Sequence, residues 1–286
     1  MGYSGSLSTG ALAAGGTLGI LIPPSVILII YSILTEQNIA KMFLAAFVPG
    51  ILAALGYLIA IAIFVRIKPD SGPPTSYVGW RQRLNLFGQV WQILVIYFLV
   101  IGGIYLGWFT PTEGASIGAA GTGIMALFTK GFNFSDLIDV IKDTAVTSAM
   151  IFLVLLGAEF FNSFIALTQI TNELATFVIS NELSPYLVVF CILVLYILLG
   201  CLMDSLAMIL LTIPVFFPII IELDFGMSIE EVAIWFGILT LIVVEVGLIT
   251  PPVGLNVFII NKMAKNVPIS DTFIGVLPFL ISDLIR

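Results

Sequence analysis

Long apolar stretches separated by short polar segments dominate this chain. Runs of about 20 apolar residues are long enough to cross a bilayer as a helix. These runs lack the alternation of membrane strands, and only helices or closed barrels satisfy backbone groups in lipid. The pattern therefore predicts an all-α polytopic membrane protein. The apolar runs cover 8–34, 42–65, 84–109, 112–129, 144–167, 185–221, 232–262 and 272–286.

Two of these runs carry the same short interruption. The sequence GILIPP at residues 19–24 interrupts the run 8–34, and GLITPP at residues 247–252 interrupts the run 232–262. Proline lacks an N–H group and clashes with the preceding helical turn, so both helices are expected to unwind here. Corresponding breaks in two halves of a membrane protein are typical of secondary transporters with a solute site between the halves. The alternative is a simple proline kink that packs against neighbouring helices.

Composition supports lipid as the main solvent and excludes several functions. The chain is 60% hydrophobic and 9% charged, with a mean hydropathy of +1.18. Its net charge of -7 argues against nucleic-acid binding, which needs a basic face. The chain has no histidine, which excludes a histidine-based metal or catalytic site. Cys191 and Cys201 lie in one apolar run and suggest neither a disulfide framework nor a zinc site.

The charge distribution predicts the orientation of the spans. The densest basic segment, 66–83, contains four Arg and Lys residues with several Pro and Gly, so we expect a cytoplasmic linker. Counting spans from this loop places the N-terminus in the cytoplasm and makes 8–34 and 232–262 run in opposite directions. The sequence thus predicts inverted repeats. The first ends within 1–65, and the second occupies 84–286, with an unwound helix at 232–262 and the start of a last helix at 272–286.

The two breaks also predict ion ligands. Carbonyl groups near a break are expected to lose their helical partners, and a dehydrated Na⁺ would satisfy them together with a threonine hydroxyl. The candidate Na⁺ ligands at the two breaks are Gly15, Gly16, Thr17, Gly19, Pro23, Glu245, Gly247, Thr250 and Pro251. For Glu245 the alternative is a bracing role, in which its carboxylate accepts backbone N–H bonds of the unwound segment.

A further candidate lies in the run 185–221, which is interrupted at Asp204 and Ser205. Each flanking arm has about 15 residues and would extend roughly 23 Å as helix, which is short of a full span. These lengths favour a re-entrant hairpin with Asp204 at its tip. Two full spans with Asp204 in a tight cytoplasmic turn are also compatible with the loop count. An ionisable group at membrane depth is a functional-site hypothesis, so we add Asp204 and Ser205 to the Na⁺ ligands.

Several of these segments resemble one family, the large membrane (permease) subunit of tripartite ATP-independent periplasmic (TRAP) transporters. The resemblance covers essentially the whole chain. It is carried by residues 9–25, 47–50, 102–113 and 247–256, which include both interrupted motifs. It implies a substrate-moving domain of two hairpins and two unwound helices that slides against a fixed scaffold. It also implies Na⁺-driven uptake in the bacterial inner membrane. The implied substrate is a dicarboxylate, keto acid or sugar acid delivered by a periplasmic binding protein, and a small membrane subunit completes the system.

The resemblance also assigns positions to individual residues. It implies that Asp204 and Ser205 lie at the tip of the outward-opening hairpin, and that the unwound segments share ion binding with the hairpin tips. The candidate substrate-binding residues on these segments are Pro24, Ser25, Pro252, Gly254 and Asn256. In the family a first hairpin precedes the segment that begins here at Gly2 and Tyr3. We therefore expect an incomplete fold and a truncated subunit.

Other functions remain possible from the sequence. A stand-alone divalent-anion symporter of the same superfamily would lack a binding protein, and co-purification with such a protein would separate the two. An intramembrane enzyme would use Asp204, Glu159 or Glu245, but the sequence shows no paired catalytic geometry. A non-transporting fragment is the third alternative. We expect no enzyme activity, no cofactor and no metal other than Na⁺ as the coupling ion.

Overall fold

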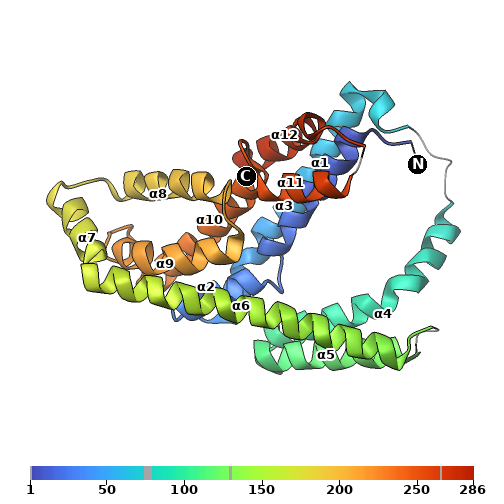
Figure 1. Ribbon diagram of the computed structural model, residues 1–286, viewed down its shortest axis with the longest axis horizontal. Helices are drawn as coiled ribbons and strands as arrows, with labels where there is room; N and C mark the ends of the chain where they lie inside the picture. Colours follow the sequence, from blue (N-terminus) through green and yellow to red (C-terminus); the bar gives the residue numbers. More distant parts are fainter. Residues whose placement is uncertain (1, 74–78, 129–130, 265) are drawn as a thin grey trace. The chain divides into compact units, whose positions relative to one another are not determined.

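The computed structural model describes residues 2–73, 79–128, 131–264 and 266–286. All regular secondary structure in these ranges is helical. Figure 1 shows their arrangement. Residues 74–78 of the predicted linker 66–83 and residue 129 of the predicted helix 112–129 lie outside the described residues. The helices are α1 Gly5–Leu21, α2 Val26–Leu34, α3 Ile39–Ile67, η1 Pro69–Ser71, α4 Trp80–Tyr105, α5 Pro111–Phe128, α6 Phe134–Thr168, α7 Ile170–Ser180, α8 Pro185–Gly200, α9 Ser205–Ile221, α10 Ile229–Ile249, α11 Leu255–Met263 and α12 Ile269–Ile285.

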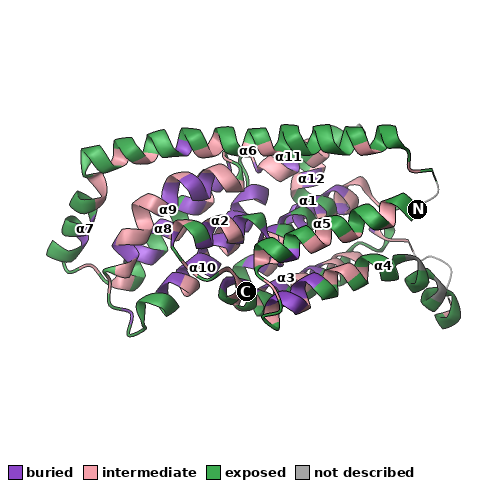
Figure 2. Ribbon diagram, turned by 90° about the horizontal axis from the view of Figure 1, so that it is seen from below, coloured by how far each residue is buried: buried purple, intermediate pink, exposed green. Residues whose placement is uncertain are grey.

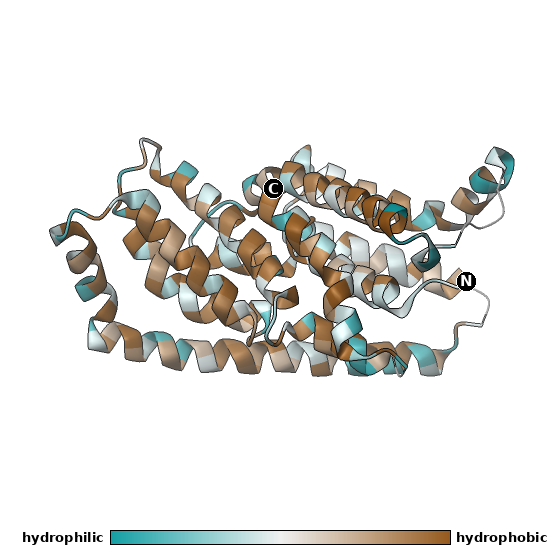
Figure 3. Cartoon of the chain, turned by 90° about the horizontal axis from the view of Figure 1, so that it is seen from above, coloured by the Kyte–Doolittle hydropathy of each residue, from teal (hydrophilic) through white to brown (hydrophobic). Residues whose placement is uncertain are grey.

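The helices have the length and composition of membrane spans. Four stretches within the described ranges are long and apolar enough to cross a bilayer, and the bent helix α4 is a further candidate. Figure 3 shows hydrophobic residues along most of the helices, with hydrophilic residues mainly near helix ends and connections. Many of these large apolar side chains are exposed, which suits contact with lipid tails. The chain is therefore a polytopic helical membrane protein. The four stretches are Gly5–Leu34, Ile39–Ile67, Phe134–Thr168 and Ile229–Ile249.

The chain forms two compact units. Unit 1 comprises Met1–Pro73 and Ala158–Arg286, and unit 2 comprises Pro74–Gly157. Helix α6 begins in unit 2 and ends in unit 1. The predicted repeats, 1–65 and 84–286 on either side of the linker 66–83, are defined by internal symmetry. Compact units do not test that symmetry, so the repeats stay a prediction.

Helix α10 is the most buried of the four candidate spans. It starts with a capping box, in which Ser228 Oγ accepts from the Glu231 amide at 3.3 Å and Glu231 Oε2 accepts from the Ser228 amide at 2.9 Å. Most of its remaining length is buried, and Figure 2 shows buried positions concentrated on the helices of unit 1. A core cluster that includes Ala13, Tyr57 and Ile249 joins α1 and α3 to α10, α11 and α12. Burial of this apolar surface is the main stabilising contribution.

Two pairs of helices are separated at the repeated motif. Residues 22–25 separate α1 from α2, and residues 250–254 separate α10 from α11. The tandem prolines lie in both breaks, where they stop the helix by removing N–H donors. Both Pro–Pro peptide bonds are cis. A third interruption, residues 201–204, turns α8 into α9 so that the two form a helical hairpin (Figure 1).

Helices α8 and α10 cross at a pair of glycines just before two of these interruptions. A Cβ atom on Gly247 would lie 2.8 Å from the Cα atom of Gly200 and 3.1 Å from the carbonyl oxygen of Ile197. Both neighbours are backbone atoms, which cannot rotate away. Glycine at this position therefore permits the close approach of α10 to α8, as small residues do at helix crossings in membranes.

We expect Gly247→Ala to reduce the free energy of unfolding by about 1–3 kcal/mol, because the added methyl group overpacks this crossing. Thermal or denaturant unfolding of the protein in lipid vesicles measures the loss. Gly19→Ala is the matched control, since Gly19 opens the other copy of the motif and its Cβ atom would meet nothing within 4 Å. Equal destabilisation by both variants would contradict the explanation.

Candidate functional site

The first break begins later than the sequence predicts. Helix α1 ends only at Leu21, so the carbonyl groups of residues 15–17 keep their helical partners, and the expectation that they lose them is wrong. Gly19 is the first residue whose carbonyl group cannot receive a helical bond, because Pro23 supplies no N–H. Ser25 bridges the break. Its buried hydroxyl donates to the Ile20 carbonyl oxygen at 2.5 Å and also caps α2.

The second break satisfies two of the carbonyl groups that precede it. The Thr250 amide donates to the Gly247 carbonyl oxygen at 3.1 Å, and the Thr250 hydroxyl donates to the Val246 carbonyl oxygen at 2.6 Å. Thr250 thus replaces the donor that Pro251 lacks, and the expected loss of partners at Gly247 does not occur. Helix α11 starts from Gly254, whose φ of 58° lies in the left-handed region that glycine adopts readily.

The turn between α8 and α9 lies against the second break. Cys201 Sγ lies 3.6 Å from the carbonyl oxygen of Pro251, close to the crossing of Gly200 and Gly247. Asp204 is exposed in this turn, and its Oδ1 atom accepts from first-turn amides of α9 at 2.8 and 3.3 Å. The carboxylate is therefore the N-cap of α9, and Ser205 follows it as the first helical residue.

The candidate substrate-binding residues differ in their exposure and in their contacts. A Cβ atom on Gly16 would lie 3.7 Å from Asn256 Nδ2, so the Asn256 amide on α11 faces a helical glycine of α1. Pro24 and Pro252 are exposed at the two breaks. Gly16 and Asn256 are thus brought together from opposite ends of the chain.

Five side chains near the ends of α1 and α10 form a buried polar ring: Thr17, Tyr57, Asp283, Arg286 and Glu245. The Thr17 hydroxyl donates to Glu245 Oε1 at 3.1 Å, and Arg286 Nη2 donates to Glu245 Oε2 at 2.8 Å. Arg286 Nη2 also lies 3.6 Å from Asp283 Oδ1. Tyr57 Oη closes the ring, 2.6 Å from Asp283 Oδ2 and 3.4 Å from Thr17 Oγ1.

The ring gives Glu245 a clear structural role. Its side chain is fully buried, and each of its oxygen atoms accepts a bond from a side chain of another helix. Its bracing function therefore uses a hydroxyl and a guanidinium rather than the backbone N–H groups that the sequence suggested. The contact between Thr17 and Glu245 joins the two broken helices directly.

Sequence reasoning missed three members of the ring. Asp283 carried a usable signal, because an ionisable residue within the last apolar stretch is unusual in a membrane. Arg286 gave no signal of this kind, and Tyr57 resembles any other aromatic residue of an apolar helix. Their importance comes from their partners, which lie on different helices.

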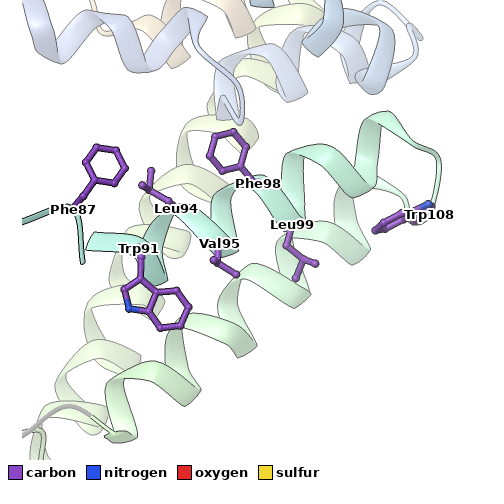
Figure 4. Close-up of a pocket in the computed structure, with 7 residues that line it drawn as sticks. All are labelled: Phe87, Trp91, Leu94, Val95, Phe98, Leu99 and Trp108. Carbon is purple, nitrogen blue, oxygen red and sulfur yellow. The ribbon is translucent and has the colours of Figure 1, made fainter. Parts of the chain in front are cut away.

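Unit 2 has a different kind of cavity. A pocket of about 500 Å³ lies along α4, and Figure 4 shows aromatic and aliphatic side chains around it. No carboxylate or cationic group lines it, so it does not supply ion ligands. Its lining residues are Phe87, Trp91, Leu94, Val95, Phe98, Leu99 and Trp108.

Comparison with known proteins identifies the family. The family model described as "Tripartite ATP-independent periplasmic transporter, DctM component" matches residues 1–286. The chain belongs to this family. Members are components of transporters, so the DctM family is not an enzyme family, and the resemblance inferred from the sequence is confirmed.

Three relatives illustrate the range of this family. The C4-dicarboxylate TRAP transporter large permease protein DctM of Pseudomonas aeruginosa is 33% identical over 280 residues, which cover 98% of this chain. The sialic acid TRAP transporter permease protein SiaT of Haemophilus influenzae is 32% identical over 98% of the chain. The isethionate TRAP transporter permease protein DctMQ of Oleidesulfovibrio alaskensis is 28% identical over 92%. The DctM-family chain spans 64%, 44% and 41% of these relatives.

Proposed function

We propose that this chain is part of the permease subunit of a Na⁺-coupled importer of an organic acid. The observation that carries the proposal is that the two interrupted helices, α1 and α10, contact each other in unit 1 of a DctM-family protein, and that a third interruption contacts the second break. Thr17 and Glu245 join the two broken helices at 3.1 Å, and the α8–α9 turn contacts the second break through Cys201. Solute sites of secondary transporters are built from such interrupted helices.

The contact between the two interrupted helices also supports an inverted repeat. Thr17 and Glu245 are 228 residues apart, which is also the spacing of Gly19 and Gly247 in the repeated motif. Equivalent residues of two symmetry-related elements contact each other only where they lie at the symmetry axis. We infer that a pseudo-two-fold axis passes between Thr17 and Glu245. An elevator-type movement of these elements against a scaffold, with the α8–α9 hairpin re-entrant, is the mechanism that we propose for this arrangement.

We propose that Na⁺ binds at the second break and the adjoining α8–α9 turn. The Asp204 carboxylate and the backbone oxygen atoms near Gly247–Pro252 are hard oxygen ligands of the kind that Na⁺ requires. Glu245 is a weaker candidate, because Thr17 and Arg286 already occupy its oxygen atoms. At the first break the equivalent ligands are the carbonyl groups from Gly19 onward rather than those of residues 15–17.

The names of the relatives support an organic acid as substrate. C4-dicarboxylates, sialic acid and isethionate are all acids, although they differ in size and charge distribution. We propose that the exposed prolines of both breaks and Asn256 face this substrate. The proposed partners are a periplasmic substrate-binding protein and a small membrane subunit. The proposed location is the bacterial inner membrane, with the N-terminus in the cytoplasm.

We expect acid uptake by the whole transporter, reconstituted in vesicles with its binding protein, to collapse when external Na⁺ is replaced by choline. A Na⁺ gradient supplies the driving force, and choline is too large for a site built from carbonyl groups. Uptake of labelled C4-dicarboxylate, sialic acid and isethionate measures the effect and ranks the substrates. Unchanged uptake in choline would overturn Na⁺ coupling, and uptake without any binding protein would favour a stand-alone symporter.

A further inference from the structure

The buried polar ring contains two carboxyl groups but only one cation. The side chains of Glu245 and Asp283 are 0% exposed, and that of Arg286 is 6% exposed. The groups that act electrostatically on Asp283 are Tyr57 from α3, Glu245 from α10 and Arg286 from its own helix. Helix α1 carries no titratable side chain, and Lys262 of α11 is exposed. With every group ionised, the ring would therefore hold one uncompensated negative charge, which is costly in a membrane interior.

The geometry distinguishes the two carboxyl groups. Glu245 has the cation: Arg286 Nη2 donates to its Oε2 atom at 2.8 Å, and its Oε1 atom lies 3.1 Å from the Thr17 hydroxyl, which also reaches the Ala14 carbonyl oxygen at 2.7 Å. Asp283 has less. Its Oδ1 atom lies 3.6 Å from Arg286 Nη2 and has no hydrogen-bond partner among the described residues, and its Oδ2 atom contacts only the Tyr57 hydroxyl. A buried carboxylate in this position has one neutral donor, the Tyr57 hydroxyl at 2.6 Å, and no cation within hydrogen-bond distance, which is little to stabilise an anion.

We propose that Asp283 is a proton-binding site, occupied at neutral pH by a proton taken from water. The neutral acid removes the excess charge of the ring and leaves Glu245 and Arg286 as a matched ion pair. It is a site for H⁺ distinct from the Na⁺ sites proposed at the breaks, and it does not depend on transport.

The hydroxyl groups of the ring can be oriented so that they accommodate this proton. In the structure the Tyr57 hydroxyl donates to Asp283 Oδ2 at 2.6 Å, and with the proton on Oδ2 this bond reverses, so that the acid donates to Tyr57 Oη. The Tyr57 hydroxyl then donates to Thr17 Oγ1 over 3.4 Å, where either oxygen can be the donor. The Thr17 hydroxyl has two acceptors within reach, Glu245 Oε1 at 3.1 Å and the Ala14 carbonyl oxygen at 2.7 Å. Each O–H group donates once along this path, because hydroxyl groups rotate to suit their partners.

Infrared spectroscopy of the whole protein in lipid vesicles tests the proposal without any transport assay. We expect a carboxylic-acid C=O stretch at neutral pH in both Na⁺ and choline buffers, absent in Asp283→Asn. The matched control is Asp271→Asn, which changes the first turn of the same helix outside the ring and should keep the band. Because Asn has the shape of the neutral acid, Asp283→Asn should also keep its unfolding temperature. Persistence of the band in Asp283→Asn, or its presence only without Na⁺, would overturn the proposal.

Arg286→Gln provides a second and opposite test of the charge balance. Removing the guanidinium takes away the cation that lies 3.6 Å from Asp283 Oδ1, so the neutral acid should be favoured further and its band should persist to higher pH than in the wild type. Loss of the band in folded Arg286→Gln protein would show that the charge balance is wrong. If this variant does not fold, the comparison of Asp283→Asn with Asp271→Asn decides.

Discussion

Arg286→Met should reduce the free energy of unfolding by about 3–5 kcal/mol, because it leaves the fully buried Glu245 carboxylate without its partner. The lost bond is the 2.8 Å contact between Arg286 Nη2 and Glu245 Oε2. Methionine fills a similar volume with apolar atoms, so the loss reflects charge rather than a cavity. Thermal unfolding in lipid vesicles, followed by circular dichroism, measures the change.

Two comparisons isolate the buried charge. The double variant Glu245→Gln/Arg286→Met removes both charges and should recover most of the lost stability, since a buried ion pair is readily replaced by neutral groups. Lys41→Met breaks an exposed ion pair with Glu230, where both side chains are at least half exposed, and should cost at most about 1 kcal/mol. A double variant no more stable than Arg286→Met would contradict this account.

Asp204→Ala should abolish Na⁺-dependent uptake by the whole transporter while the protein still reaches the membrane. The substitution removes the carboxylate that we propose as a Na⁺ ligand, and it also removes the N-cap of α9. Loss of a cap alone costs about 1 kcal/mol and would not prevent folding of a helix that is largely buried. Uptake at several Na⁺ concentrations, normalised to protein in the membrane, measures the effect.

Asp204→Asn separates ion binding from capping. Asparagine caps helices as well as aspartate does, so α9 should keep its start and the protein its unfolding temperature. If the charge binds Na⁺, this variant should need far more Na⁺ for uptake than the wild type. Wild-type Na⁺ dependence in Asp204→Asn would limit Asp204 to a structural cap and remove it from the proposed site.

Local sequence patterns were enough to locate the breaks but not to describe their bonding. The tandem prolines predict that the helices are interrupted within the repeated motif, because proline removes a donor wherever it occurs. They do not predict that Thr250 would supply the missing donors at the second break. Nor do they predict that α1 would remain helical to Leu21. These details depend on side-chain rotation and on the exact turn at which the last bond forms.

The sequence by itself determined the all-helical membrane class, the family and the positions of the interruptions. Hydrophobic run length and proline chemistry act locally, so they can be read along the chain. Only the tertiary structure decided which polar groups meet. Thr17 and Glu245 come together across 228 residues, and Tyr57, Asp283 and Arg286 join them from two further helices. A buried charge is stable only beside a partner, and the packing of the helices determines which partner it has.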